Sequence, residues 1–457
     1  MIVMKFGGTS VQDAKAIDRV AQIVQGRLAD RPVAVVSAMA KVTDSLLAMG
    51  KAAGSGDRKT ALKMARALRE RHYETAGELL GTALFTEFHG DLGADFEDLD
   101  ELLRGIGAVG EITPRTYDYV ASFGEVLSSK IVAAAFVARG MPGVHVDSRQ
   151  CLLTDSSFTR AVPQFEETNE RLKKKVAPAI EAGKIPVMGG FIGSNRVGIT
   201  TTIGRGGSDF SAAIFGAGLG AQRIEIWTDV DGMMTTDPRL CPDARRIKVI
   251  SFDEAAELAY FGAKVLHPAT VLPAIQQNIP VYVLNSQNPT CEGTKVTARA
   301  PHCTNIFKAI ALKKKITLVE VAAPRRLLVH GYLKSIFELF DQHNVAVDVV
   351  STSEVSVSVT AETNESIPAL AADLAKLADV KYEGRKAIVC LVGVNLRETP
   401  GIAAKVFGLL ENVKIRMISQ GASEINLTFV IEEDDATEVV RRLHHAFFAE
   451  ADPEVFA

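Results

Sequence analysis

Short apolar runs alternate with longer amphipathic stretches over the first 300 residues. The runs are rich in β-branched residues and have the length of buried strands, whereas Ala14 to Leu28 and residues 57–105 carry apolar residues at helical spacing. This alternation predicts an α/β domain with a mostly parallel sheet, in which ligands bind at the carboxyl ends of the strands. The predicted strands are IVMKF (2–6), PVAVVSA (32–38), IPVMGGFIG (185–193), RIEIWTDV (223–230) and IPVYVLN (279–285).

The remainder of the chain has a different, repetitive pattern. Residues 286–312 break the alternation with Asn288-Pro289 and Gly293, which marks a domain boundary. Beyond it, an offset of 70 residues aligns Gly331 with Gly401 and Ser353-Glu354 with Ser423-Glu424. We therefore expect two copies of one unit, each in the order strand, Gly-started helix, strand, turn, strand, helix.

Charge and composition narrow the class of protein. The 457 residues, enough for about three domains, hold 51 Lys and Arg against 55 Asp and Glu, a net charge of −4. The sequence has no long block of basic residues, and such a block would be expected if nucleic acid or an anionic membrane were a partner. The apolar run 131–138 is far shorter than the ~20 residues of a membrane span, and the N-terminus lacks a secretion signal. The five scattered cysteines indicate reduced thiols of a cytoplasmic protein, without a disulfide framework or a zinc site.

Two glycine-rich segments do not have the sequence context of a ligand-binding loop. Gly105, Gly107 and Gly110 form a GxGxxG, yet they follow a helical stretch and precede Thr113-Pro114, so we do not expect a dinucleotide there. Gly216, Gly218 and Gly220 end an Ala-rich helix and indicate close packing and a helix cap.

Two other glycine-rich loops are predicted to bind anions. KFGGTS (5–10) begins at the end of the first strand and combines Lys5 with two glycines. GRGGSD (204–209) likewise combines Arg205 with adjacent glycines, and it ends on Asp209. Glycines let backbone N–H groups turn towards an anion, a helix N-terminus adds a favourable dipole, and Lys5 adds a full charge. The two loops together indicate a phosphate-bearing ligand with a second anionic partner.

Six motifs follow one another along the chain: KFGGTSV (5–11), VVSAMAKVTD (35–44), SFGEVLSS (122–129), TTTIGRGGSD (200–209), TDVDGMMTTDPR (228–239) and FGAKVLHP (261–268). Together with the tail, they resemble the aspartate kinase family, in its monofunctional form, over nearly the whole chain. The tail, including residues 347–359 and 419–431, is similar to the paired regulatory ACT domains of that family.

The resemblance implies a fold, domain ranges and a reaction. The fold is a three-layer αβα sandwich with a mostly parallel sheet, the amino-acid kinase fold, plus two βαββαβ ACT domains. The catalytic domain would span 1–300 and the ACT domains 313–385 and 386–457, the second completed by a strand from 303–312. The reaction is transfer of the γ-phosphoryl group of ATP, with Mg²⁺, to the side-chain carboxylate of L-aspartate. The product, 4-phospho-L-aspartate, leads towards lysine, threonine and methionine.

The resemblance also implies roles for individual residues, with no protein ligand to a metal among them. Lys5 would stabilise the transferring phosphoryl group, and Asp209 would organise this lysine. Substrate-binding positions are Ser37, Thr43, Glu125, Arg205, Gly206, Gly207 and Ser208, of which Arg205 would grip the α-carboxylate of aspartate. ATP-binding positions are Gly7, Gly8, Thr228, Asp229, Met234, Arg239 and Lys264. Effector-binding positions are Gly331, Tyr332, Leu333, Asp348, Ser353 and Glu354.

Departures from the family pattern leave two questions open. Met234 stands where relatives often have Tyr, so adenine would pack on a thioether. Arg326 and Val329 stand where lysine-inhibited relatives often have Met and Ser; lysine is the expected effector and threonine stays open.

We also expect a homodimer or a dimer of dimers. The alternatives are a kinase of glutamate or acetylglutamate, and an amino-acid sensor with an inactive kinase site.

Overall fold

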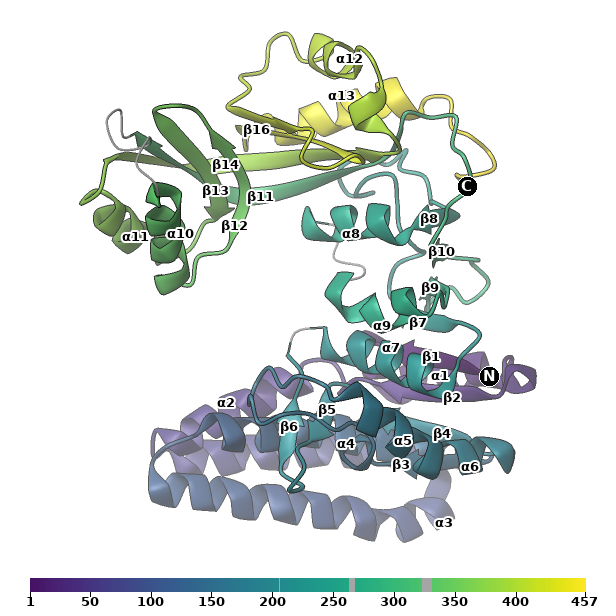
Figure 1. Ribbon diagram of the computed structural model, residues 1–457. Helices are drawn as coiled ribbons and strands as arrows, with labels where there is room; N and C mark the ends of the chain where they lie inside the picture. Colours follow the sequence, from purple (N-terminus) through teal and green to yellow (C-terminus); the bar gives the residue numbers. More distant parts are fainter. Residues whose placement is uncertain (205, 263–267, 323–330) are drawn as a thin grey trace. The chain divides into compact units, whose positions relative to one another are not determined.

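The computed structural model describes residues 1–204, 206–262, 268–322 and 331–457 (Figure 1). Spatial proximity divides the chain into two compact units. The first holds residues 1–232 and 265–300, and the second holds residues 233–264 and 301–457. Segment 233–262 therefore packs with the tail of the chain, although it lies within the predicted catalytic range. The predicted domain ranges stay a prediction.

The first unit is built on a sheet whose strands run in the order β3-β4-β2-β1-β7-β9-β10. All neighbouring pairs from β3 to β9 are parallel, and β10 is antiparallel to β9. The strands are β1 (Ile2–Phe6), β2 (Pro32–Val36), β3 (Gly143–Val146), β4 (Ile185–Gly189), β7 (Ile224–Thr228), β9 (Val281–Asn285) and β10 (Thr294–Thr297). The mostly parallel sheet predicted from the apolar runs is confirmed.

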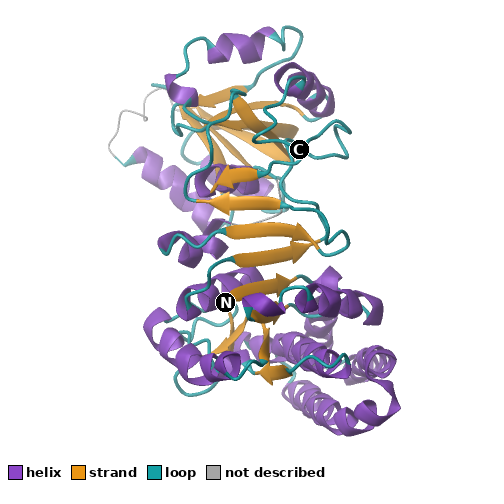
Figure 2. Cartoon of the chain, turned by 90° about the vertical axis from the view of Figure 1, so that its right-hand side faces the viewer, coloured by secondary structure: helices purple, strands orange, loops and turns teal. Residues whose placement is uncertain are grey.

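Helices cover both faces of this sheet, which gives the expected three layers (Figures 1 and 2). One layer holds α1 (Ala14–Gln25), α2 (Val42–Gly54), α3 (Arg58–Val109) and α4 (Pro114–Ala138); the other holds α5 (Phe165–Lys175), α6 (Ala177–Glu181), α7 (Gly207–Leu219) and α9 (Leu272–Gln276). The helical excursion predicted at 57–105 is α3, which changes direction at Gly81. The short hairpin β5 (Ile192–Ser194) and β6 (Thr200–Thr202) and the 3-10 turns η1 (Gly8–Val11), η2 (Leu28–Asp30), η3 (Ser148–Gln150) and η4 (Pro268–Val271) complete the unit.

The helix α4 is the core helix of this unit. Among the described residues it is the one helix that is long and apolar enough to cross a membrane, and 83% of its most apolar window is buried inside the protein. Its buried side chains pack against β3, β4 and the neighbouring helices. Burial against the sheet therefore accounts for its apolar composition.

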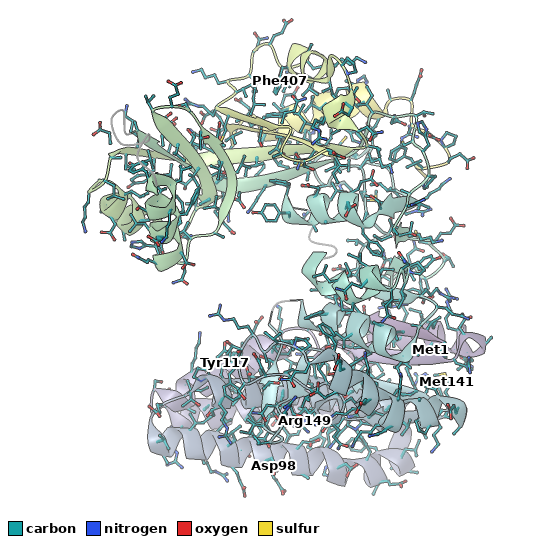
Figure 3. The ribbon with its side chains drawn as sticks, in the orientation of Figure 1. Met1, Asp98, Tyr117, Met141, Arg149 and Phe407 are labelled. Carbon is teal, nitrogen blue, oxygen red and sulfur yellow. The ribbon has the colours of Figure 1, made fainter. Side chains whose placement is uncertain are left out.

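The second unit contains an antiparallel sheet in the order β12-β13-β11-β14-β16-β15. Its strands are β11 (Phe307–Ala322), β12 (Val347–Thr352), β13 (Ser356–Glu362), β14 (Asp379–Gly393), β15 (Met417–Gln420) and β16 (Asn426–Glu432). Its helical segments are α10 (Tyr332–Gln342), α11 (Ile367–Leu374), η5 (Leu396–Glu398), α12 (Ile402–Gly408) and α13 (Ala436–Phe448). Phe407 of α12, labelled in Figure 3, packs edge-on against Phe429 at 5.5 Å between ring centroids. Near the tail lie β8 (Val249–Ser251) and α8 (Phe252–Tyr260) of segment 233–262.

The internal repeat is confirmed by backbone geometry. Gly331 and Gly401 have φ of 88° and 74° and begin α10 and α12, and such left-handed positions favour glycine. Lys315 and Arg385, again 70 residues apart, both have positive φ where the register of β11 and β14 shifts. The Lys315 carbonyl accepts from the Thr363 amide, and 70 residues on the Arg385 carbonyl accepts from the Glu433 amide. Two copies of one unit are thus built on paired long strands.

Candidate active site

The first glycine-rich loop leaves β1 at the centre of the parallel sheet. Lys5 is the penultimate residue of β1 and is buried. The Gly7 amide donates to the carbonyl of Trp227 on the neighbouring β7 at 3.2 Å, so sheet pairing already uses this predicted phosphate donor. A Cβ on Gly8 would lie 2.9 Å from the Ala38 carbonyl oxygen. The second glycine therefore permits close approach of two loops, and its predicted contact with ATP stays a prediction.

The second glycine-rich loop opens α7. Gly206 caps this helix with φ of 69°, Gly207 is its first residue, and Asp209 lies in its first turn. The Asp209 carboxylate oxygen Oδ1 lies 2.6 Å from Lys5 Nζ, with the two side chains 17% and 11% exposed. The structure thus brings together the two residues predicted to be catalytic, from loops about 200 positions apart. Arg205 and Lys264 lie outside the described residues.

Tight packing fixes where α7 begins. A Cβ on Gly190, just after β4, would lie 2.7 Å from Ser208 Cα. The Phe191 amide donates to Ser211 Oγ at 2.9 Å, which ties the start of the β5–β6 hairpin to the same helix. The N-terminus of α7, and with it Asp209, is therefore held against the carboxyl end of β4, where parallel sheets bind ligands.

Glu125 is a buried carboxyl group beside the same loops. It lies on α4, is 3% exposed, and its Oε1 accepts from the Ala38 amide at 3.1 Å. Its Oε2 is buried without a hydrogen bond among the described residues. Burial raises the pKa of Glu125 to about 8, because the charged form loses its hydration, and the Ala38 amide offsets this only in part. A cation brought by a substrate would satisfy the free oxygen.

The other predicted substrate residues lie at the carboxyl end of β2 and just beyond it. The Ser37 amide donates to the Phe6 carbonyl at 3.1 Å, and its carbonyl accepts from Ser128 Oγ at 2.8 Å. Thr43 lies in the first turn of α2 and is half-buried. Ser37 is thus fixed between β1 and α4, whereas the role of Thr43 rests on its position alone.

Asp118 is a buried carboxylate near the second glycine-rich loop that sequence reasoning missed. It is fully buried on α4, and its carboxylate accepts from the Thr159 amide and from both the amide and hydroxyl of Thr202, at 2.7–3.0 Å. Burial raises its pKa, and these donors lower it in part. Asp118 thereby holds β6 two residues before the second glycine-rich loop. Its spacing of seven from Glu125, which places both carboxyls on one helix face, was the available signal.

The predicted nucleotide residues fall in both compact units. Thr228 ends β7, and its carbonyl accepts from the Ser286 amide at 2.8 Å, while its hydroxyl donates to Asp229 at 3.2 Å. Met234, in the second unit, is half-buried and forms a β-bridge with Arg246. Arg239 extends into solvent, with 89% of its side chain exposed, and its guanidinium group binds both oxygens of Asp237 at 2.7–3.1 Å.

The predicted effector residues occupy two places in the first repeat. Gly331, Tyr332 and Leu333 begin α10, where Tyr332 is buried and Leu333 is 41% exposed. Asp348 lies on β12, and the exposed Ser353 and Glu354 follow in the turn, where Ser353 Oγ bonds to Ser356. The Asp348 side chain is 4% exposed, and its Oδ1 lies 2.6 Å from Lys313 Nζ on β11. The Asp348 carboxylate thus already binds an ammonium group of the chain.

A groove of about 670 Å³ lies in the first unit and is lined by residues outside the two glycine-rich loops. Its lining includes Arg149, labelled in Figure 3, together with Arg171, Lys175 and Asp147. Asp147 binds the Arg149 guanidinium at 2.7–3.1 Å, and Lys175 donates to Gln150 at 2.7 Å. Within the groove, Asp147 therefore neutralises Arg149, and Gln150 fixes the position of Lys175.

Comparison with known proteins finds relatives over nearly the whole chain. The model of the amino acid kinase family matches residues 1–285, and an ACT domain model matches residues 389–447. The chain is 37% identical to lysine-sensitive aspartokinase 3 of Escherichia coli (strain K12), over 98% of this chain and 99% of that protein. It is 38% identical to chloroplastic aspartokinase 2 of Arabidopsis thaliana, over 99% of this chain and 85% of that protein.

Solved structures give the same relationship. Aspartokinase III of Escherichia coli in complex with lysine and aspartate, in its T-state, matches with a TM-score of 0.86 at 36% identity, over 98% of this chain and 99% of that one. The same enzyme with aspartate and ADP, in its R-state, matches with a TM-score of 0.84 at 36% identity, over 98% and 100% of the two chains.

The sheet, the paired glycine-rich loops and the repeated tail define an amino acid kinase with ACT regulatory domains. Identity above one third over nearly the full length of both chains narrows the class further. The chain belongs to the aspartokinase family and is a kinase of aspartate, as the resemblance implied.

Proposed function

We propose that this aspartate kinase transfers the γ-phosphoryl group of ATP to the side-chain carboxylate of L-aspartate with Lys5 and Asp209 at the reacting centre. A carboxylate oxygen of aspartate attacks the γ-phosphorus, the bond to the β–γ bridging oxygen breaks, and ADP leaves. The attacking carboxylate is already ionised at neutral pH, so the step needs no general base. What it needs is positioning and positive charge on the transferring group.

The observation that carries the proposal is the ion pair between Lys5 and Asp209. Two glycine-rich loops, each at the carboxyl end of a strand or at the start of a helix, meet through this 2.6 Å contact. The carboxylate fixes the direction of the lysine side chain before substrate arrives, and such preorganisation reduces the cost of stabilising transition-state charge. Arg205, Gly206, Gly207 and Ser208 would hold aspartate beside this pair.

Glu125 would bind the α-ammonium group of aspartate. Its buried Oε2 has no hydrogen-bond partner among the described residues, and its pKa of about 8 keeps most of the group protonated at neutral pH. An arriving ammonium group favours the charged form, so substrate binding and ionisation of Glu125 would be linked.

Mg²⁺ would enter with the nucleotide. No cluster of three His, Cys, Asp or Glu side chains with ligand spacing occurs in the part of the chain that the structure describes. Mg²⁺ is commonly held by substrate phosphates and water with few protein ligands. Bound to ATP, it would neutralise phosphate charge. Thr228, Asp229, Met234, Arg239 and Lys264 would bind the nucleotide.

Regulation would act through the ACT repeats. Lysine appears with aspartate in the T-state structure of the Escherichia coli relative, which supports lysine as the effector here, and threonine is the second candidate. Asp348 is the proposed ammonium partner because it is buried and its Oδ2 has no hydrogen bond among the described residues. We also propose a cytoplasmic homodimer, or a dimer of such dimers, on the grounds of the family pattern.

A substrate panel tests the reaction. The chain is incubated with ATP, Mg²⁺, hydroxylamine and one of L-aspartate, L-glutamate or N-acetyl-L-glutamate, and the trapped hydroxamate is measured. An acyl phosphate should form from aspartate at a rate at least about a hundredfold above the rates with the other two substrates. Glutamate is longer than aspartate by one methylene group, and a difference of one methylene can change the rate of an enzyme by about this factor. Comparable rates with glutamate would refute the assignment of the substrate.

A further inference from the structure

Segment 233–248 carries two predicted nucleotide residues, Met234 and Arg239, yet it is built into the unit of the C-terminal repeats. Its chain is paired with the last residues of the protein: Lys248 N donates to the Val455 carbonyl at 2.8 Å, and Ala457 N donates to the Arg246 carbonyl at 2.9 Å. Ile247 and Phe456 form a β-bridge between these two strands of backbone. The last residues of the chain therefore pair with segment 233–248 through backbone hydrogen bonds, as a neighbouring β-strand would.

Thr235 is the point at which this segment is fixed most firmly. Directly after Met234, it is fully buried, and its amide donates to the Arg245 carbonyl at 2.8 Å. Its carbonyl accepts from the Ile310 amide of β11 at 2.7 Å, and its hydroxyl oxygen accepts from the Arg245 amide at 2.9 Å. The remaining hydroxyl proton can therefore be donated to a further acceptor.

That acceptor is His444 of the last helix. His444 is 2% exposed on α13, its Nε2 lies 2.8 Å from Thr235 Oγ1, and its Nδ1 lies 3.3 Å from Cys241 Sγ. A neutral imidazole that accepts from Thr235 at Nε2 and donates to Cys241 at Nδ1 satisfies all these groups. Burial lowers the pKa of His444, which favours this neutral form.

A second residue of α13 contacts the same segment. Arg441, one turn before His444, donates from Nε to the Leu240 carbonyl at 2.6 Å. The imidazole of His444 stacks on Phe448 at 4.9 Å between ring centroids, and Phe448 meets Phe456 edge-on at 5.7 Å. Both ends of the segment that contains Met234 and Arg239 are thus attached to α13 or to the residues after it.

We propose that His444 of the second ACT repeat is a positioning residue for the nucleotide, acting through Thr235 and Cys241 on segment 233–248. This inference rests on the proposed nucleotide role of Met234 and Arg239. It assigns to α13 a part in ATP binding that is separate from effector binding in the first repeat. A change at His444 should therefore weaken nucleotide binding while the site for aspartate is left intact.

The test compares His444→Ala with His445→Ala, because the adjacent His445 is exposed and on the other face of α13. The full chain is used, and the KM values for ATP and aspartate are measured together with the Kd for ADP by calorimetry. His444→Ala should raise the KM for ATP and the Kd for ADP about three- to tenfold, the effect of one lost hydrogen bond on an equilibrium constant. The KM for aspartate should change less than about twofold, and His445→Ala should match the wild type.

Conservative variants separate positioning from loss of packing. His444→Gln can keep the bond to Thr235 and should recover most of the affinity for ATP. Thr235→Val keeps the side-chain volume, should raise the KM for ATP as His444→Ala does, and should add little to it in the double variant. If His444→Ala fails to fold, Thr235→Val carries the same test.

Two results would overturn the inference. One is an unchanged KM for ATP in His444→Ala or Thr235→Val; the other is an equal rise in both KM values. If the wild type does not phosphorylate aspartate, the proposed function fails, and the Kd for ADP still decides whether His444 positions a nucleotide.

Discussion

At the scale of single residues, the proposed centre of the reaction is the contact between Lys5 Nζ and Asp209 Oδ1. Lys5 and Asp209 lie in motifs whose residue types indicate their chemistry, and the structure joins them at 2.6 Å. The Gly7 amide is different, because its partner, the Trp227 carbonyl, belongs to a strand 220 positions away. Sequence alone gives no sign that this donor is used within the sheet. Asp118 was missed for the same reason: its partners Thr159 and Thr202 become neighbours only in the fold.

Glu125 leads to a prediction about pH. Its raised pKa of about 8 means that the free enzyme holds a proton there at neutral pH, while the proposed partner of the substrate ammonium is the ionised form. The kcat/KM for aspartate should therefore rise between pH 6.5 and 8.5 with a midpoint near 8, since this ratio reports the free enzyme. Glu125→Gln should be less active and should lose this rise. A pH-independent wild-type profile would remove ionised Glu125 from substrate binding.

The raised pKa of Glu125 also predicts how the stability of the protein depends on pH. Stability should fall as pH rises, whereas the kcat/KM for aspartate should rise. The pKa of Glu125 is higher in the folded state than the ordinary value of 4.5, so the folded state binds more protons between these two values. Stability contributed by this group must therefore fall as pH rises from about 4.5 to about 8. Thermal unfolding of the wild type relative to Glu125→Gln should show this loss, and a relative gain with pH would contradict the burial of Glu125.

At the scale of elements, apolar patterning predicted five strand segments of the first unit and the repeat of the tail, whereas β3, β6 and β10 were not predicted. The predicted strands at 2–6, 32–38, 223–230 and 279–285 correspond to β1, β2, β7 and β9, with ends that differ by a few residues. The length of β11 and β14 was not evident. Each continues through a shift of register at Lys315 or Arg385, where the backbone has positive φ. No glycine or proline lies next to Lys315 to signal this irregularity, whereas Gly384 beside Arg385 was an available signal in β14.

The ion pair between Lys313 of β11 and Asp348 of β12 bears on regulation. Lys313 also lies over the ring of Tyr260, with Nζ 5.8 Å from its centroid, and Tyr260 donates to the Val347 carbonyl at 3.0 Å. An effector ammonium group at Asp348 would therefore compete with Lys313 for the same carboxylate, because two cations at one buried carboxylate repel each other.

Opposite effects of two substitutions test this competition. Asp348→Ala should raise the half-inhibitory lysine concentration at least about tenfold, the ~1.4 kcal/mol of a lost charged contact, with uninhibited activity within a few-fold of wild type. Lys313→Met should lower that concentration, since the competing ammonium group is gone. Asp341→Ala, exposed on α10, is the control. A wild type that ignores lysine would shift the test to threonine, and an unaffected Asp348→Ala would place the effector elsewhere.

At the scale of the whole molecule, residues that are neighbours in the sequence can belong to different compact units. The motif TDVDGMMTTDPR reads as one segment, but compact packing places Thr228 in the first unit and Met234 in the second. The attachment of segment 233–248 to α13 joins residues about 200 positions apart, and no periodicity marks it. The sequence could therefore predict which elements form, whereas the grouping of segments depends on contacts that only the folded chain defines.

Self-association is the prediction at this scale. The strand β12 is an edge of its sheet, and Val350 on it is 37% exposed. An exposed edge with apolar side chains favours pairing with a second copy. Sedimentation should show a homodimer or a multiple of it, and Val350→Lys should weaken the association at least about tenfold. Val197→Lys, 78% exposed in the first unit, should not. A wild type that is monomeric at micromolar concentration would contradict the prediction.

The most direct test of the account is the kcat of Lys5→Ala, measured beside Lys15→Ala, an exposed lysine on α1. Loss of the ammonium group that Asp209 holds in place should lower kcat at least about 10²- to 10³-fold, as removal of one preorganised donor does, while the Kd for ADP changes far less. Lys15→Ala should be as active as the wild type. A Lys5→Ala enzyme with near-native turnover would show that the Lys5–Asp209 pair is not the centre of the reaction.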